Sequence, residues 1–361
     1  MPYARRRAAL RGQLRDLELD ALLITDLINI RYLTGFTGSN GALLVHTEGE
    51  ERTVFCTDGR YRTQSAREVP DLRLVIERAS ALRLVKEVTE AGIGRLGFES
   101  HVVTVDRHGA LVEITGADRL IAVSRPVERL RLVKDEHEVA ALRAACAAAD
   151  AALAGLIAEG GLRPGRTERE VARDLEARMV EAGASGPSFE SIVATGPNSA
   201  VPHHRPANAE LACGDLVKMD FGALIDGYHS DMTRTVVLGA PAEWQRELYD
   251  LVAAAQAAGR AALRAGAEVR EVDSAARDVI AGAGHGEDFL HGLGHGVGLQ
   301  IHEAPALSQL GVGTLAAGMT VTVEPGVYLA DRGGVRIEDT LVVADGEPEL
   351  LTLTTKDLVV V

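Results

Sequence analysis

Two predicted β-hairpins that carry acidic residues inside apolar strands constrain the fold of this chain most strongly. The first covers residues 216–238, where Asp226-Gly227 is a signal for a two-residue type I′ turn. With that turn, Asp220 and Asp231 leave the same face of the hairpin at nearly opposed positions. Two carboxylates that close repel each other unless a cation or a shared proton lies between them.

A second hairpin repeats this pattern. Strands at 320–326 and 335–343 flank a predicted loop at 330–334, which again puts two acids, Glu324 and Glu338, on one face. An unpaired carboxylate in an apolar β run is costly. For one such acid a structural salt bridge is the better explanation, but four acids in paired hairpins favour a common site.

The chain also contains a faint internal repeat. Residues 162–171 and 263–272 share Leu, Arg, Gly, Arg, Glu and Val at the same positions. In each copy a long helix is predicted to end near the glycine, and a second helix follows. We therefore expect a duplicated α-α-β unit about a pseudo-twofold axis.

Three histidines, His291, His295 and His302, lie between the two hairpins. The spacing of the first two resembles the helical zinc motif His-Glu-x-x-His. Four glycines among residues 292–298 argue against a helix, and no glutamate follows His291, so we reject that motif. A glycine-rich backbone beside histidines instead suggests a chain that approaches a site closely.

A turn-rich stretch at 196–206 precedes the first hairpin and carries the adjacent His203 and His204. Such a stretch is typical of a loop at the mouth of a site. Taken alone it is a weak signal.

The candidate ligands form a hard, oxygen-rich set that suits Mn²⁺, Co²⁺ or Zn²⁺. Five ligands exceed what one catalytic zinc needs, which favours a bridged pair of ions about 3.5–4 Å apart. Such a pair can hold a hydroxide and polarise a carbonyl, which is the chemistry of amide or ester hydrolysis. The five are Asp220, Asp231, His295, Glu324 and Glu338.

In order, type and approximate spacing, these five residues resemble the ligands of the pita-bread metallopeptidases. The resemblance covers the chain from about residue 135 to its end. Residues 32–41 and 57–61 are similar to the N-terminal domain of Xaa-Pro aminopeptidases and prolidases. Methionine aminopeptidases share the catalytic fold but lack that domain, so they fit poorly.

The resemblance implies a role for each position. Asp231 and Glu338 would bridge two metals, Asp220 would hold one of them, and His295 with Glu324 would hold the other. Glu324 would also carry a proton to the leaving nitrogen. Three histidines and an arginine would complete the site: His302 at the scissile carbonyl, His291 and His203 at the proline pocket, and Arg336 near the metals.

The resemblance implies a peptidase that hydrolyses the Xaa-Pro bond at the N-terminus of peptides, with Mn²⁺ as the expected ion. Within the family, the sequence modestly favours an Xaa-Pro aminopeptidase over a prolidase restricted to dipeptides. Creatinase shares the two-domain fold but works without metal, and it should lack the complete ligand set. A non-catalytic binding protein of the same fold is a remote alternative, because such relatives typically lose ligands.

The first part of the chain alternates strands and helices, which predicts an α/β domain. Expected strands are 21–25, 41–46, 53–56 and 72–76, and expected helices are 5–17 and 81–91, the latter with Ser80 as its N-cap. A long helix from Asp135, with Glu138 completing a capping box, follows. We expect a creatinase-like α/β domain at 1–128 and an α+β pita-bread domain at 129–361.

Composition excludes few classes of protein but sets expectations. Lys and Arg number 38 and Asp and Glu 52, a formal charge of −14, which argues against a nucleic-acid partner. The basic start is not followed by a signal-length apolar stretch, and no run of eighteen apolar residues suggests a membrane span. We expect a cytoplasmic enzyme, and the resemblance implies a homodimer. The native metal, the preferred first residue, the peptide length and the physiological substrate are not encoded in any recognisable pattern.

Overall fold

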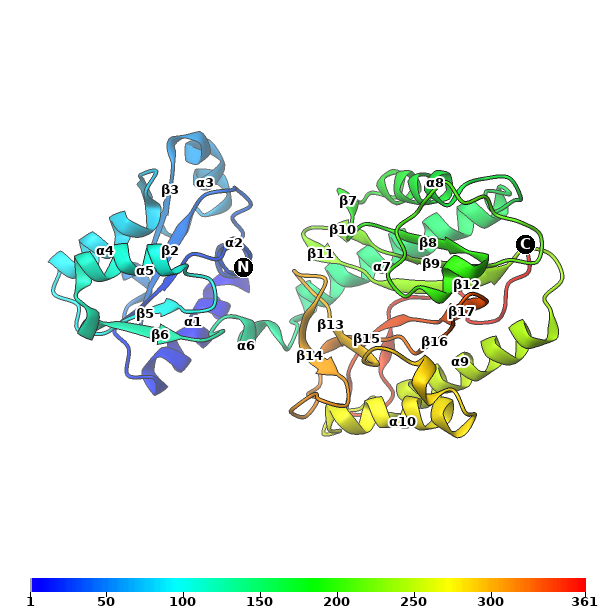
Figure 1. Ribbon diagram of the computed structural model, residues 1–361. Helices are drawn as coiled ribbons and strands as arrows, with labels where there is room; N and C mark the ends of the chain where they lie inside the picture. Colours follow the sequence, from blue (N-terminus) through cyan, green and yellow to red (C-terminus); the bar gives the residue numbers. More distant parts are fainter. Residues whose placement is uncertain (1) are drawn as a thin grey trace. The chain divides into compact units, whose positions relative to one another are not determined.

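The computed structural model describes residues 2–361, and the chain divides into two compact units after Arg131. The sequence placed this boundary near residue 128. Figure 1 shows the first unit in blue to cyan and the second in green to red.

The first unit is built on a six-stranded sheet with the order β4-β3-β2-β1-β5-β6, and helices flank it (Figure 1). Strand β1 is parallel to β5 and antiparallel to β2. The buried strands of this sheet place apolar side chains against those of the flanking helices. The strands are β1 (Ala21–Ile24), β2 (Ala42–His46), β3 (Val54–Thr57), β4 (Arg73–Ile76), β5 (Leu96–Glu99) and β6 (Leu120–Val123). The helices are α1 (Pro2–Asp16), α2 (Leu27–Thr34), α3 (Arg62–Glu68), α4 (Ser80–Glu90), α5 (Val105–Thr115) and α6 (Glu128–Arg131).

All four strands and both helices expected in this unit are confirmed to within a few residues, whereas β5, β6 and the helices α2, α3 and α5 were not anticipated. The predicted N-cap of α4 is wrong. Ser80 is the first residue of the helix, and its hydroxyl donates to the carbonyl oxygen of Glu77 at 2.9 Å. Ala79 occupies the cap position without a side-chain hydrogen bond. A local serine-to-carbonyl bond thus competes with capping.

The second unit packs two helix pairs against two antiparallel sheets, with orders β12-β9-β8 and β14-β13-β15-β18-β19, and adds two small ones (Figure 1). The helices are α7 (Glu136–Ala158), α8 (Glu168–Glu181), α9 (Glu243–Ala262) and α10 (Val269–Gly282). The strands of its first half are β7 (Gly186–Pro187), β8 (Ile192–Thr195), β9 (Leu216–Phe221), β10 (Ala223–Ile225), β11 (Tyr228–His229) and β12 (Met232–Val237). Those of its second half are β13 (Gly294–Gly296), β14 (Glu303–Leu307), β15 (Thr320–Val323), β16 (Gly326–Leu329), β17 (Gly333–Arg336), β18 (Asp339–Val342) and β19 (Glu349–Leu350).

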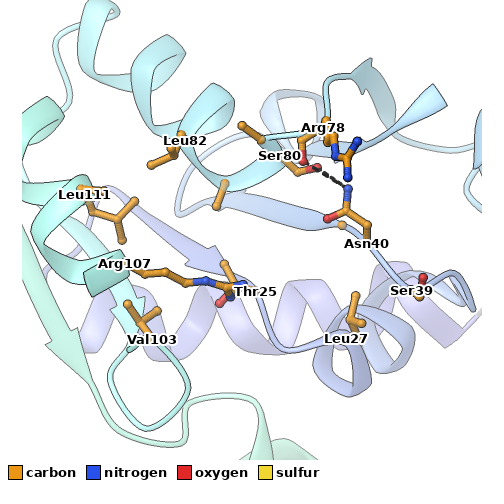
Figure 2. A pocket seen from close by; sticks show the side chains of 14 residues that line it. Thr25, Leu27, Ser39, Asn40, Arg78, Ser80, Leu82, Val103, Arg107 and Leu111 are labelled. Atoms are coloured by element: carbon orange, nitrogen blue, oxygen red, sulfur yellow. Dashed lines mark hydrogen bonds between the residues drawn. The ribbon is translucent and has the colours of Figure 1, made fainter. Parts of the chain in front are cut away.

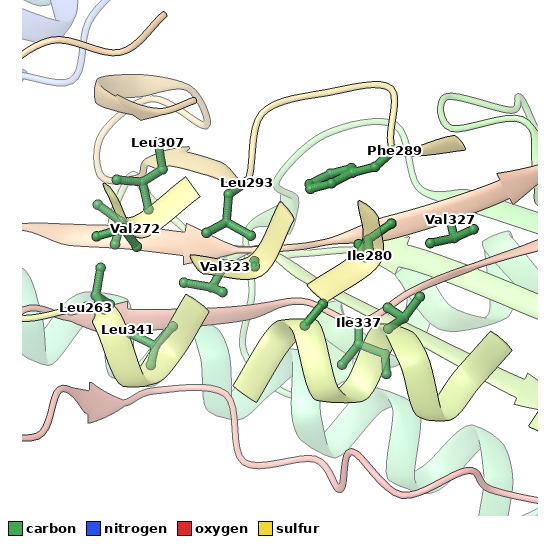
Figure 3. Packing of buried hydrophobic residues seen from close by; sticks show 14 of the residues in the cluster. Leu263, Val272, Ile280, Phe289, Leu293, Leu307, Val323, Val327, Ile337 and Leu341 are labelled. Carbon is green, nitrogen blue, oxygen red and sulfur yellow. The ribbon is translucent and has the colours of Figure 1, made fainter. Parts of the chain in front are cut away.

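The predicted duplication of this unit is confirmed. Helices α7 and α8 pack on the first sheet and α9 and α10 on the second, each with its own apolar core. Figure 3 shows the second core, where helix residues meet strand residues such as Val323 and Leu341. The two helix connections match in detail: Gly165 N–H donates to Leu211 O at 2.9 Å, and Gly266 N–H donates to Leu315 O at 2.8 Å.

The register of the first hairpin is as predicted. Asp226 and Gly227 both have positive φ, 49° and 75°, as a type I′ turn requires, and Asp220 pairs with Thr233. This register places Asp220 and Asp231 on one face.

The predicted register of the second hairpin is wrong by two residues. Leu329 pairs with Gly333, so the loop is 330–332 and not 330–334. The same alignment continues at Val323 and Asp339, which brings Glu324 directly in line with Glu338. Gly333 and Gly334 have the composition of a loop, but they lie in strand β17. Glycine is required at position 334 because a Cβ there would come within 2.6 Å of the Ser199 carbonyl oxygen.

The two halves of this unit meet along a seam between β12 and the segment 336–340. Glu338 N–H donates to Thr233 O at 3.1 Å, and Thr340 Oγ1 donates to Asp231 O at 2.8 Å. Arg234, almost fully buried, donates to the Asp339 carboxylate at 2.8 Å across the same seam. These bonds bring the two acidic hairpins together edge to edge.

Helix α7 is long and apolar enough to cross a membrane by length and composition alone, but half of its most apolar window is buried inside the unit. Its N-terminus has the expected capping box of Asp135 and Glu138. The core helix of a soluble protein has these same properties. Helix α7 is therefore weak evidence for a membrane.

Candidate metal centre

The five predicted ligands line one cavity of about 310 Å³ in the second unit. Four of them occupy equivalent places in the duplicated hairpins: each acid lies at the end of a strand, where the chain leaves one sheet pairing and enters the next. The fifth, His295, lies on β13 between the hairpins. The lining residues are Phe189, Glu190, Ser191, Ile192, His203, His204, Arg205, Pro206, Asp220, Asp231, His295, Ile301, His302, Glu324 and Glu338.

His295 joins carboxylates from both hairpins. Its Nε2 lies 3.4 Å from Asp231 Oδ2 and 3.4 Å from Glu324 Oε1. The potential ligand atoms of Asp231, His295 and Glu338 all lie within 4.8 Å of one another. The other ring nitrogen of His295, Nδ1, lies 3.0 Å from the carbonyl oxygen of Gly296. A carbonyl oxygen can only accept, so Nδ1 carries the hydrogen and Nε2 faces the carboxylates.

The electrostatics of the cluster fit a bound cation. Burial raises the pKa of Asp231 to about 6 and that of Glu324 to about 7, and burial with neighbouring carboxylates holds the pKa of Glu338 well above its usual value. Burial alone would lower the pKa of His295, but Asp231 and Glu324 outweigh it and raise that pKa to about 9. Four carboxylates crowded into one largely buried place are stabilised by added positive charge, which a divalent ion would supply.

Two carboxylate oxygens support the same conclusion. Asp220 Oδ1 and Glu338 Oε1 are buried and have no hydrogen-bond partner among residues 2–361. Buried polar atoms in native proteins are almost always satisfied, and an ion is one of the partners that satisfies them. The donor set therefore fits divalent ions, with Asp220, Asp231, His295, Glu324 and Glu338 to hold them.

Two threonines orient the ligands, and the sequence analysis missed both. Thr233 Oγ1 donates to Glu338 Oε2 at 2.7 Å, and Thr322 Oγ1 donates to Glu324 Oε1 at 3.2 Å. Each threonine lies two residues from an acid of its own hairpin, so it shares that acid's face of the strand. A threonine two residues from an acid in the same strand was the sequence signal that could have identified them.

Arg336 is buried beside the ligands, as the resemblance implied for it. It donates to Asp220 Oδ2, to Thr233 Oγ1 at 3.0 Å and to the Tyr328 hydroxyl at 2.8 Å. The buried Lys218, two residues before Asp220, donates to Val201 O at 2.6 Å; burial lowers its pKa well below the usual value. The sequence analysis missed both Lys218 and Tyr328.

The predicted histidines lie at different depths. His302 and His203 line the cavity, and the His302 ring lies 4.4 Å from the His295 ring, centre to centre. His291 is not among the residues lining the cavity. Its Nδ1 donates to Gly292 O at 2.8 Å and its Nε2 lies 2.8 Å from the Tyr328 hydroxyl, so both ring nitrogens are engaged.

The fixed ring of His291 is neutral. Burial lowers the pKa of His291 to about 3, so the ring carries no charge near neutral pH. In this structure His291 supports the site through Tyr328 and Arg336, and it does not face the cavity directly.

The glycines around His295 allow close contact between this stretch and the backbone of neighbouring strands. A Cβ at Gly294 would lie 2.1 Å from Thr322 O, and one at Gly296 would lie 2.2 Å from Ala304 O. The stretch is extended, not helical, which confirms the rejection of a helical zinc motif. The same stretch brings His295 to the cavity, and its glycines let it pack closely against strands β14 and β15.

A buried carboxylate anchors the loop at the mouth of the cavity. Glu168, in the first turn of α8 and fully buried, accepts hydrogen bonds from Thr195 N–H, Asn198 Nδ2, His204 Nε2 and Ala207 N–H. These donors lie at both ends of the loop that carries His203. The predicted mouth loop is thus held from behind by an acid that the sequence analysis did not select.

Comparison with known protein families covers both units. Residues 6–133 match the Creatinase/Prolidase N-terminal domain, and residues 140–345 match metallopeptidase family M24.

Individual relatives match over nearly the whole chain. The chain is 36% identical to the Xaa-Pro dipeptidase of Pyrococcus furiosus over 94% of this chain and 95% of that protein. Among solved structures, the Xaa-Pro dipeptidase from Bacillus anthracis is 38% identical with a TM-score of 0.94, covering 99% of this chain and 100% of the other. An X-Pro aminopeptidase from Thermotoga maritima is 32% identical with a TM-score of 0.89, covering 97% of this chain and 100% of the other.

The domain matches, the full-length relatives and the carboxylate cluster agree with one another. The chain is a two-domain enzyme that belongs to metallopeptidase family M24.

Proposed function

We propose that this peptidase hydrolyses the bond between a first residue and a following proline, with two divalent ions held in the cavity. The observation that carries the proposal is the cluster of three buried carboxylates, one partly buried carboxylate and one imidazole, in which two carboxylate oxygens have no partner among the described residues. Full-length relatives named Xaa-Pro dipeptidase and X-Pro aminopeptidase support the choice of bond.

The residues of the chain divide the work as follows. Asp220, Asp231, His295, Glu324 and Glu338 would together hold the ions. A bound pair of divalent ions would polarise the scissile carbonyl and activate a water molecule. Glu324 would accept a proton and pass it to the leaving proline nitrogen.

The cavity offers further groups to the substrate. His302 and His203 line it and would contact the scissile carbonyl and the proline ring. Arg336 would hold Asp220 in place through its hydrogen bond to Oδ2, and His291 would support Arg336 through Tyr328. We propose Mn²⁺ as the working ion, with Co²⁺ or Zn²⁺ as substitutes, because all three accept this ligand set.

The length of the substrate divides two candidates. The sequence favoured an Xaa-Pro aminopeptidase, but an Xaa-Pro dipeptidase is supported at least as well, since two of the relatives described above carry that name. We therefore propose Xaa-Pro dipeptides as the first substrates to test, and longer Xaa-Pro peptides as the second.

The test compares Xaa-Pro and Xaa-Pro-Yaa peptides with Mn²⁺ present, after chelation, and after Mn²⁺ is restored. We expect cleavage before proline that chelation abolishes and Mn²⁺ restores. Glu324→Gln should abolish turnover, while Glu190→Gln, a change of the same kind at the exposed rim, should retain it. Proline-specific cleavage that survives chelation would refute the metal mechanism, and cleavage of tripeptides alone would exclude the dipeptidase.

We also propose that the enzyme is a cytoplasmic homodimer that binds proline-containing peptides and neither nucleic acid nor membranes. The acidic composition and the wide spacing of the three cysteines support this environment. Cell fractionation would test the compartment, and sedimentation equilibrium would test the dimer.

A further inference from the structure

The N-terminal unit contains a cavity of its own, with a volume of about 310 Å³. All of its lining residues belong to the first 131 residues, so it is separate from the carboxylate cluster. It lies where β1 and β4 end and β2 begins, and the starts of α4 and α5 complete it (Figure 2). Carboxyl ends of parallel strands are a usual place for ligands in open α/β sheets.

The walls of this cavity are largely apolar. Leu27, Leu82, Val103 and Leu111 surround it in Figure 2, and alanines of α4 and α5 fill the space between them. Ligand pockets are typically lined by apolar side chains with a few polar groups that fix the orientation of the ligand. An occupant would therefore need an apolar body.

Two arginines supply the charge of the cavity. Arg107 extends from α5 toward Thr25, and Arg78 approaches Asn40 (Figure 2). Neither guanidinium has a hydrogen-bond or ion-pair partner among residues 2–361, and the lining contains no acid. By contrast, the buried Arg7 of the same unit is paired with Glu50 and Asp71. Arg78 and Arg107 are exposed to solvent, so their positive charge stays available to a ligand at this cavity.

Neutral donors face the same space. Thr25 Oγ1 is buried without a partner among the described residues. Helix α4 begins at the cavity with Ala79 at its cap, so no side chain accepts from the backbone N–H groups of its first turn. Ser39 and Asn40 line the cavity as well, but their polar groups already bond to the Tyr61 hydroxyl and the Asp58 carboxylate, so they are not among the free donors. Donors without acceptors favour a ligand that carries negatively charged oxygens.

We propose that this cavity binds a small carboxylate with an apolar body, such as a free acyl acid or the C-terminal residue of an apolar peptide. The carboxylate lies between Arg78 and Arg107, and the apolar part lies against Leu27, Leu82 and Leu111. The two guanidinium groups match a planar carboxylate better than lysines would, because each can donate two parallel hydrogen bonds.

The test uses the full-length protein and titration calorimetry with three anionic probes and one uncharged control. 4-Methylpentanoate has the apolar body and carboxylate alone, N-acetyl-leucine adds a peptide amide, and inorganic phosphate has charge without an apolar body. We expect saturable binding of one or both carboxylates. Binding of N-acetyl-leucine alone would identify a peptide C-terminus as the source, and binding of both would identify any apolar acid. N-acetyl-leucinamide, which lacks the charge, should not bind.

Variants locate the binding. Arg78→Gln combined with Arg107→Gln should weaken carboxylate binding about ten- to a hundredfold, as expected for charge-assisted hydrogen bonds. Arg62→Gln, at an exposed arginine of the same unit outside the cavity, is the matched control and should bind as the wild type. Ala110→Leu, which fills the cavity and leaves both arginines, should also weaken binding.

Circular dichroism and thermal melting report whether each variant is folded, and peptidase activity should be unchanged because none of these residues lines the metal centre. Equal affinity in the wild type and the double variant would overturn the proposal, since it would place the ligand elsewhere. Binding of phosphate alone, or no saturable binding of either carboxylate, would overturn it as well.

Discussion

The anchor of the mouth loop leads to a prediction that separates stability from substrate binding. Glu168 is fully buried and accepts four hydrogen bonds, from Thr195 N–H at 2.9 Å, Asn198 Nδ2 at 2.9 Å, His204 Nε2 at 2.7 Å and Ala207 N–H at 3.0 Å. The change Glu168→Gln keeps the shape of the side chain. It keeps Oε1 as the acceptor for the first two donors.

The cost of this change comes from the second oxygen. The amide nitrogen of glutamine would face Ala207 N–H, a donor left without an acceptor, which costs about 1–3 kcal/mol. His204 can accept from that amide by changing its tautomer, so its bond is weakened but not lost. The remaining bonds lose their charge assistance. We expect the free energy of unfolding to fall by about 2–3 kcal/mol.

The assay follows urea denaturation by fluorescence. Trp244 is the single tryptophan of the chain and lies in the first turn of α9, so its emission reports the catalytic unit and not the N-terminal one. Glu170→Gln is the matched control: Glu170 lies on the same helix but is exposed, and among residues 2–361 its carboxylate bonds only to Thr167. Glutamine also completes a capping box, so the bonds to Thr167 are kept and only the negative charge at the helix start is lost, which should cost about 0.3–1 kcal/mol.

Kinetics supply the second measurement and rest on the proposed substrates. Because Glu168 holds the loop that carries His203, the variant should raise KM for an Xaa-Pro peptide about tenfold, equivalent to about 1.4 kcal/mol of binding. The metal ligands lie on other strands, so kcat should change far less. If KM stays at the wild-type value while stability falls, the loop does not contribute to substrate binding. If stability matches that of the Glu170→Gln control, the buried acid does not anchor the loop.

Three further outcomes are expected. Burial raises the pKa of Asp231 to about 6 and that of Glu324 to about 7, above their usual 3.8 and 4.5, so each stabilises the metal-free fold below those usual values. That contribution to the free energy of unfolding, up to about 3 kcal/mol per group, is lost as pH rises through 6–7. Bound Mn²⁺ should remove this loss. Identical profiles of stability against pH with and without metal would contradict the prediction. Burial lowers the pKa of His46 from 6.5 to about 4. The free energy of unfolding of the N-terminal unit should therefore fall by up to about 3 kcal/mol as pH falls from 6.5 to 4, which faster hydrogen exchange in β2 would report. His46→Gln should flatten that pH dependence. Gly294→Ala should cost more than about 3 kcal/mol and weaken metal binding, because its Cβ would lie 2.1 Å from a backbone oxygen of β15, whereas Gly282→Ala, with open space around it, should be neutral or stabilising by thermal melting.

The sequence was informative where local chemistry decides the structure. Asp226-Gly227 specifies one kind of turn, and that turn sets the pairing along the whole first hairpin. The capping box at Asp135 likewise involves only neighbouring residues. The candidate ligands were found for the same reason, because a carboxylate inside an apolar strand is visible without knowledge of the fold.

Prediction failed where distant contacts decide. Gly333 and Gly334 have the composition of a loop, but they are strand residues because a segment around Ser199 packs against them. The same applies to Glu168, whose partners come from residues 27 to 39 positions later. An exposed glutamate at a helix start and a buried anchor have the same local sequence. Long-range packing distinguishes them, and no pattern of neighbours encodes it.

The seam between the duplicated halves has a consequence for how the enzyme keeps its ions. Each half contributes two carboxylates, so neither has enough negative charge by itself to retain a pair of divalent cations. A local opening between β12 and the segment 336–340 would break the hydrogen bonds of the seam and lengthen the distances between ligands of the two halves. Arg234 ties the halves together without lining the cavity, so we expect bound divalent ions to exchange with solution faster if it is replaced.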